Sequence, residues 1–175
     1  MARIMCSRTL WTALGSADQS PTTAGEPEDG GAQLGNWALK LFHRDSRQLI
    51  LALNEPTYLT LVFPGAPRES FRTFFRDALH DALLDLGVDP LRAVTEADAI
   101  ETLPLVRLAN RTLTGSLTHL EVVCQCELDY LTDLRVVQRN LNEFPHTQRP
   151  EPCVAALAVP LFLAESGRRG VARVH

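Results

Sequence analysis

The chain has 175 residues, of which 45% are hydrophobic and 22% charged, a composition that suits one globular domain. Its formal net charge of −4 offers no general attraction to phosphate backbones, so general nucleic-acid binding is not expected. Four cysteines are too few for a disulfide scaffold, and the longest apolar run, 153–164, is too short to span a bilayer. We expect a soluble, cytoplasmic protein of bacterial character, with reduced thiols and no membrane contact.

The amino-terminal part combines a short predicted strand at 2–6 and a turn of helix at 8–14 with a polar segment. Residues 16–35 are mostly Ser, Thr, Pro, Gly, Ala and acidic residues, with Leu34 as the only large apolar side chain. Such a composition cannot repay the entropy of ordering, which predicts a flexible loop inside a single domain spanning 1–175. The arginine-containing tail at 166–175 is expected to fray.

Three short runs rich in branched and aromatic residues follow, at 37–43, 48–54 and 57–63. Tight turns join them, which predicts an antiparallel β-meander. The segment 68–86 has apolar residues at helical spacing and charged residues on its other side. We therefore predict an α+β fold in which an antiparallel meander packs against several helices, with helix 68–86 lying on the sheet.

The rest of the chain continues the pattern of short elements. Gly87 is predicted to end the long helix, and Asp89-Pro90 to cap the next one. The run at 153–164 fits either a buried strand or a helix broken at Pro160, because its periodicity does not decide between them. Other predicted elements are a strand at 102–108 and helices at 117–131 and 134–141.

The polar stretch from Asn110 to Ser116 is the best candidate for a binding site. Gly115 permits unusual backbone angles, Ser116 could cap the following helix, and Arg111 could bind a phosphate or carboxylate. His119 could act as a general base beside Ser116, one helical turn away. The alternative is purely structural: Ser116 caps the helix, Asn110 fixes a turn, and Arg111 pairs with a carboxylate.

The segment 107–120 resembles the signature of a family of uncharacterised bacterial proteins, in which an Asn-Arg-Ser-x-x-Gly-Ser-x-Asn pattern leads into a helix. Trp37 before an apolar strand and the Leu-Asn-x-x-Pro of 141–145 also resemble that family. The chain departs from the pattern at Thr112, where serine is usual, and at 118–119, where an asparagine is common. Because the family is a domain of unknown function, the resemblance implies a fold and the position of a site.

No complete catalytic, metal or cofactor motif accompanies these residues. Cys124 and Cys126 are two positions apart on a predicted helix, where they face different directions, so we interpret them as core thiols. We expect no metal and no cofactor. The sequence favours a small binding or interaction protein, of a regulatory or antitoxin-like kind, with another protein as its partner. The alternative is a small enzyme or ligand-binding domain that acts on an anionic substrate at the stretch 110–116.

Overall fold

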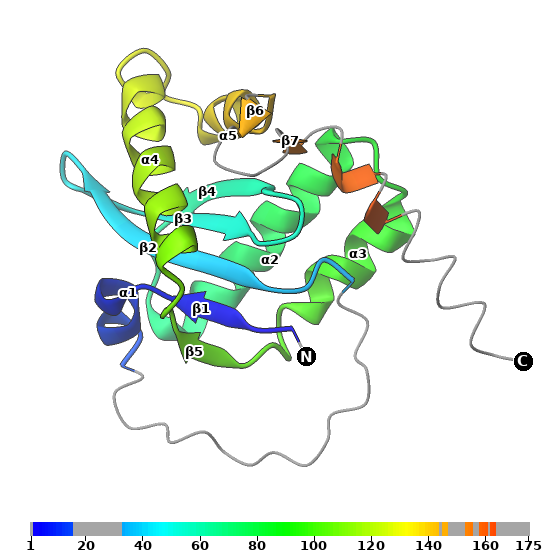
Figure 1. The fold of residues 1–175 in the computed structure, drawn as a ribbon, viewed down its shortest axis with the longest axis horizontal. Coiled ribbons are helices and arrows are strands. Elements are labelled where there is room, and N and C mark those ends of the chain that lie inside the picture. Colours follow the sequence, from blue (N-terminus) through cyan, green and yellow to red (C-terminus); the bar gives the residue numbers. More distant parts are fainter. Residues whose placement is uncertain are drawn as a thin grey trace, which may run out of the picture.

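The computed structural model describes residues 2–15, 33–143, 145–146, 153–155, 158–160 and 162–163. Within these ranges the chain is an α+β fold, as predicted, with helices on both faces of one sheet (Figure 1). The elements in chain order are β1 (Ile4–Cys6), α1 (Arg8–Ala13), β2 (Trp37–Arg44), β3 (Arg47–Asn54), β4 (Thr60–Pro64), α2 (Arg68–Asp85), α3 (Pro90–Ala99), β5 (Leu105–Arg107), α4 (Arg111–Leu128), α5 (Leu134–Glu143), β6 (Pro145–His146) and β7 (Cys153–Val154).

The main sheet has five strands in the order β4-β3-β2-β1-β5. The predicted meander is confirmed, because β2 pairs antiparallel with β3 and β3 pairs antiparallel with β4. The sheet as a whole is mixed, however, since β1 pairs parallel with both β2 and β5. The sequence predicted strands near β1 and β5 but not their parallel pairing with the meander. Strands β1 and β5 have three residues each, too few to show in the sequence how they pair.

The third strand of the meander begins later than predicted, at Thr60 instead of residue 57. The Asn54 side chain holds the preceding turn, because its Oδ1 accepts hydrogen bonds from the Thr57 amide at 3.1 Å and from the Thr57 hydroxyl at 2.7 Å. Tyr58 lies in this turn with a φ of 60°. A local side-chain bond of this type competes with strand pairing and delays the start of β4.

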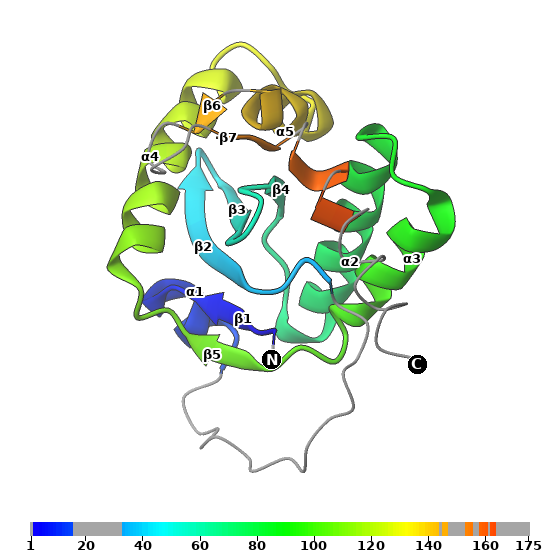
Figure 2. The same cartoon turned by 45° about the vertical axis from the view of Figure 1, so that its right-hand side comes forward.

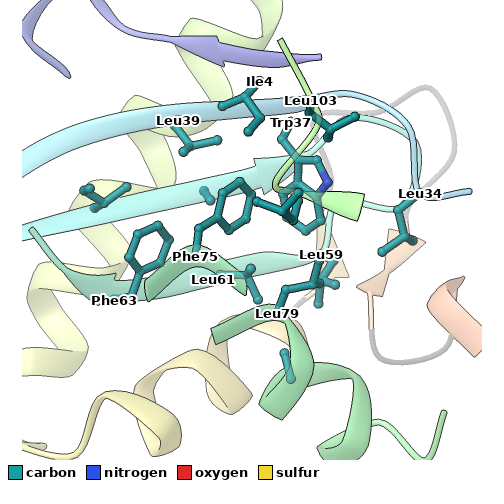
Figure 3. Close-up of a cluster of buried hydrophobic side chains, with 14 of the residues drawn as sticks. Ile4, Leu34, Trp37, Leu39, Leu59, Leu61, Phe63, Phe75, Leu79 and Leu103 are labelled. Atoms are coloured by element: carbon teal, nitrogen blue, oxygen red, sulfur yellow. The ribbon is translucent and has the colours of Figure 1, made fainter. Parts of the chain in front are cut away.

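One face of the sheet packs against α2, as the apolar stripe of that helix predicted. Phe71, Phe75 and Leu79 of α2 are buried in one cluster with Trp37 and Phe63 of the sheet. Figure 3 shows Phe75 and Leu79 beside the sheet residues Leu61 and Phe63. The helix stops at Asp85, and the predicted cap follows at Gly87, which has a φ of 74°. Helix α3 begins as predicted, with the Asp89 carboxylate accepting from the amides of Leu91 and Arg92.

The other face is covered by α4 and α5, whose apolar residues contact β2, β3 and β4. Leu113, Leu117, Leu120 and Cys124 of α4 and Val137 of α5 form the centre of this second cluster. No helix in the described ranges is both long enough and apolar enough to cross a membrane. The sequence did not decide whether 153–164 is a strand or a helix. In the structure, residues 153–154 form β7, and the described residues from 155 to 163 are helical.

Helix α5 also closes the outer edge of the sheet. Asn142 accepts a hydrogen bond from the Thr60 amide at 2.7 Å and donates one to the Thr60 carbonyl at 2.8 Å. Gln138 accepts from the Val62 amide at 3.1 Å. These two amide side chains replace the backbone groups of an additional strand, so the edge of β4 is covered.

The end of the predicted loop is attached to α3. Residues 16–32 and the predicted tail at 166–175 lie outside the described residues, but Leu34 is buried at 1% exposure. The Glu96 carboxylate accepts hydrogen bonds from the Gln33 amide at 2.8 Å and from the Leu34 amide at 3.1 Å. Glu96 itself is only 4% exposed, so this contact places a carboxylate inside the protein.

Burial raises the pKa of Glu96, and the two amide hydrogen bonds only partly oppose this effect. A raised pKa in the folded state stabilises the fold below the usual glutamate pKa of about 4.3, and this stabilisation is lost as the pH rises through the higher folded value. Glutamine does not ionise. We therefore expect the free energy of unfolding of Glu96→Gln, minus that of the wild type, to increase as the pH rises through the pKa of Glu96. Urea titrations from about pH 3.5 to 7 test it, and a difference independent of pH would contradict it.

Candidate functional site

The helix that carries the candidate residues begins earlier than the sequence predicted. Helix α4 starts at Arg111, and Asn110 is its N-cap, accepting a hydrogen bond from the Leu113 amide at 3.2 Å. Gly115 and Ser116 lie inside the helix, so the expectation that Ser116 caps it was wrong. Asparagine caps a helix as well as serine does, so the helix can begin at Asn110, ahead of Ser116. Including Gly115 inside the helix costs only about 1 kcal/mol.

The structure does not join Ser116 and His119 into a catalytic pair. Ser116 is 2% exposed, on the face of α4 that packs on the sheet, and its hydroxyl has no hydrogen-bond partner among the described residues. His119 is exposed, and no hydrogen bond connects the two side chains. Gly115 is exposed, and apart from its chain neighbours and the backbone of its own helix, no atom lies within 4 Å of an added Cβ. The predicted site residues are therefore separated by the helix, and only Asn110 and Arg111 lie at its N-terminus.

Two helices begin at the same edge of the sheet. Strands β1 and β5 are parallel neighbours with Cys6 opposite Arg107, so their carboxyl ends lie together. Helix α1 leaves β1 toward the α2 face, where Leu10 is buried, and α4 leaves β5 toward the opposite face. Figures 1 and 2 both show the first turn of α4 close to α1. Parallel strands whose following helices go to opposite faces create a crevice at their carboxyl ends, where ligands commonly bind.

This edge carries three arginines: Arg8 at the start of α1, Arg107 at the end of β5, and Arg111 at the start of α4. All three are exposed, and none makes an ion pair or a side-chain hydrogen bond with the described chain. No acidic residue occurs in 2–15 or in 102–120. We call these three arginines, together with the first turn of α4, the basic edge.

The basic edge also offers unpaired polar groups. The amides of Arg111 and Thr112 are at the beginning of α4, where helical amides have no helical partner, and the described chain provides no other acceptor for them. Ser7 lies between β1 and α1, and its buried hydroxyl has no hydrogen-bond partner among the described residues. Of these groups, the sequence alone indicated only Arg111. The recurring order of strand, short polar segment and helix could have pointed to Ser7 and Arg8.

The basic edge lies in a part of the chain that matches a known family model. A family model described as a domain of unknown function (DUF6933) matches residues 3–154. The chain belongs to this family. This agrees with the resemblance to an uncharacterised family, and no curated protein matches the chain. The region that matches DUF6933 contains β1, α1, β5 and α4, and therefore the whole basic edge.

The cysteines of the DUF6933 domain differ in their surroundings. Cys6 and Cys124 are buried, and burial raises the pKa of each thiol to about 12. Cys126 is exposed, so the interpretation of both helical cysteines as core thiols holds for Cys124 only. A thiol with such a high pKa is protonated near neutral pH and is a poor nucleophile. In the described ranges, no three His, Cys, Asp or Glu side chains are grouped so that they could hold a metal ion.

Proposed function

We propose that this protein is a binding protein that holds a small anionic group, a phosphate or a carboxylate, at the basic edge. The observation that supports this most directly is a group of three exposed arginines beside the first amides of α4. Neither the arginine side chains nor the amides of Arg111 and Thr112 have a hydrogen-bond partner among the described residues. A helix N-terminus favours negative charge, and guanidinium groups bind phosphate and carboxylate through paired hydrogen bonds.

The proposal is for binding and not for catalysis. The Ser116 hydroxyl is buried on the sheet side of α4, whereas His119 is exposed, and the Cys6 thiol near the edge is held in its protonated form. The regulatory or antitoxin-like role that the sequence favoured stays a prediction. Anion binding is compatible with that role, since acidic or phosphorylated side chains of a partner protein carry the same groups.

Replacing Arg111 by alanine tests the proposal. Arg111 is exposed and makes no ion pair or side-chain hydrogen bond with the described residues, so we expect the free energy of unfolding to change by less than about 0.5 kcal/mol. Titration of the 15N-labelled protein with inorganic phosphate should shift the amide resonances of residues 111 and 112 in the wild type. The same titration should leave these resonances unchanged in Arg111→Ala.

Arg3→Ala provides the matched control, because Arg3 is an exposed arginine at the opposite end of β1, with no ion pair in the described structure. This variant should bind phosphate as the wild type does. Equal weakening in both variants would indicate a general effect of net charge. That result, or no phosphate-dependent shift at residues 111 and 112 of the wild type, would contradict the proposal.

A further inference from the structure

A second place suited to a ligand lies between α2 and α5, away from the basic edge. A cavity of about 240 Å³ opens there. Helix α2 and its C-cap contribute Ala82, Asp85 and Leu86 to its wall, and α5 contributes Gln138, Arg139 and Glu143. The volume is below that of typical drug-sized pockets and suits a small metabolite.

Gln138 lines this cavity with a side-chain amide that can donate hydrogen bonds. The side chain is only 6% exposed, and its oxygen accepts from the Val62 amide at 3.1 Å. Only the oxygen of an amide can accept from that N–H group, so the orientation of the side chain is fixed and its nitrogen takes the other position. This nitrogen has no hydrogen-bond partner in the part of the chain that the structure describes. The nitrogen does not belong to the fully buried side-chain atoms that lack a partner, so it is open to the cavity, where a ligand acceptor can take the place of water.

Charges of both signs line the same cavity. Arg139 and Glu143 are exposed, and neither makes an ion pair with the described residues. Asp85 already interacts with Arg135, at 3.2 Å. Ala82 and Leu86 supply an apolar surface. The cavity therefore presents a free cation and an amide donor for a carboxylate, a free carboxylate for a cation, and apolar atoms beside them.

We propose that this cavity binds a free amino acid in its zwitterionic form. Gln138 and Arg139 donate hydrogen bonds to the carboxylate of the ligand, Glu143 accepts from its ammonium group, and its apolar side chain contacts Ala82 and Leu86. A ligand with only one of the two charged groups satisfies half of these contacts. Binding at this site does not depend on the anion proposed for the basic edge.

Titration of the 15N-labelled protein tests this with three probes that have related carbon skeletons: leucine, 4-methylpentanoate without the amine, and 3-methylbutylamine without the carboxylate. We expect leucine to shift the side-chain NH2 resonances of Gln138 and to bind at least about tenfold more tightly than either analogue. The other standard amino acids are tested in the same way, at up to about 10 mM, a concentration that fills even a millimolar site.

Gln138→Glu is the informative variant, because it keeps an oxygen for the Val62 amide while it replaces the amide donors with a negative charge. We expect it to remain folded and to lose leucine binding, and Arg139→Ala to weaken that binding about tenfold or more. Arg3→Ala should bind as the wild type does. The proposal is overturned if no standard amino acid shifts the Gln138 resonances, or if Arg139→Ala, which removes only an exposed side chain, binds with unchanged affinity.

Discussion

Replacing Phe75 by alanine should destabilise the protein by about 3–5 kcal/mol, a large part of the roughly 5–15 kcal/mol that stabilises a typical domain. Phe75 is fully buried and lies between two other rings. Its centroid is 5.2 Å from that of Trp37 in an edge-to-face arrangement, and 5.5 Å from that of Phe63 in a stacked one. Removing the ring takes away these contacts and leaves a cavity in the centre of the core. Chemical denaturation measures the loss.

The neighbouring residue supplies the control for this experiment. Phe74 is 42% exposed on the outer side of α2, so Phe74→Ala removes the same chemical group from a site that water already reaches. Its cost should be clearly smaller, about 1 kcal/mol or less. Similar losses for the two variants would mean that α2 does not bury the face that the structure shows.

Replacing Asn142 by leucine should cost about 2–4 kcal/mol and promote aggregation. Asn142 is 3% exposed, and its amide pairs with both the N–H and the carbonyl group of Thr60. Leucine has a similar volume but no polar atoms, so two backbone groups at the edge of β4 lose their partners, at about 1–3 kcal/mol each. An uncovered strand edge is also a template for pairing between molecules.

Asn140→Leu is the matched control on the same helix. Asn140 donates to the Glu127 side chain at 2.7 Å in a partly buried position, and no backbone edge depends on it. Its loss should cost less than about 1 kcal/mol. Denaturation curves and light scattering during heating compare the two variants. A stable, monomeric Asn142→Leu protein would show that α5 is not needed to cover the sheet edge.

The sequence predicted those parts of the fold that depend on neighbouring residues. The meander, the long helix α2 and the cap at Asp89 follow from local periodicity, turn residues and capping chemistry, and the structure contains all three. The parallel pairing of β1 depends on partners that begin at Trp37 and at Leu105. No local pattern in a strand of three residues specifies such partners, so the mixed sheet could not be predicted.

The candidate site was predicted in part, for a related reason. Local sequence correctly drew attention to Asn110 and Arg111, because a polar segment before an apolar helix marks a helix start. It misplaced that start, since both Asn110 and Ser116 are suitable caps and spacing alone does not choose between them. Arg8 and Arg107 were missed because they become neighbours only through the pairing of β1 with β5.

The position of β1 between β2 and β5 has a consequence for the order in which the sheet is completed during synthesis. A ribosome makes β1 before the other strands of this sheet, yet the residue opposite Cys6 on β5 is Arg107, about a hundred residues later. Until then, one side of β1 lacks its strand partner while the local hairpins of β2, β3 and β4 can already form. The basic edge thus cannot exist in a nascent chain that ends before α4. Any ligand held there would bind only a chain whose sheet is complete.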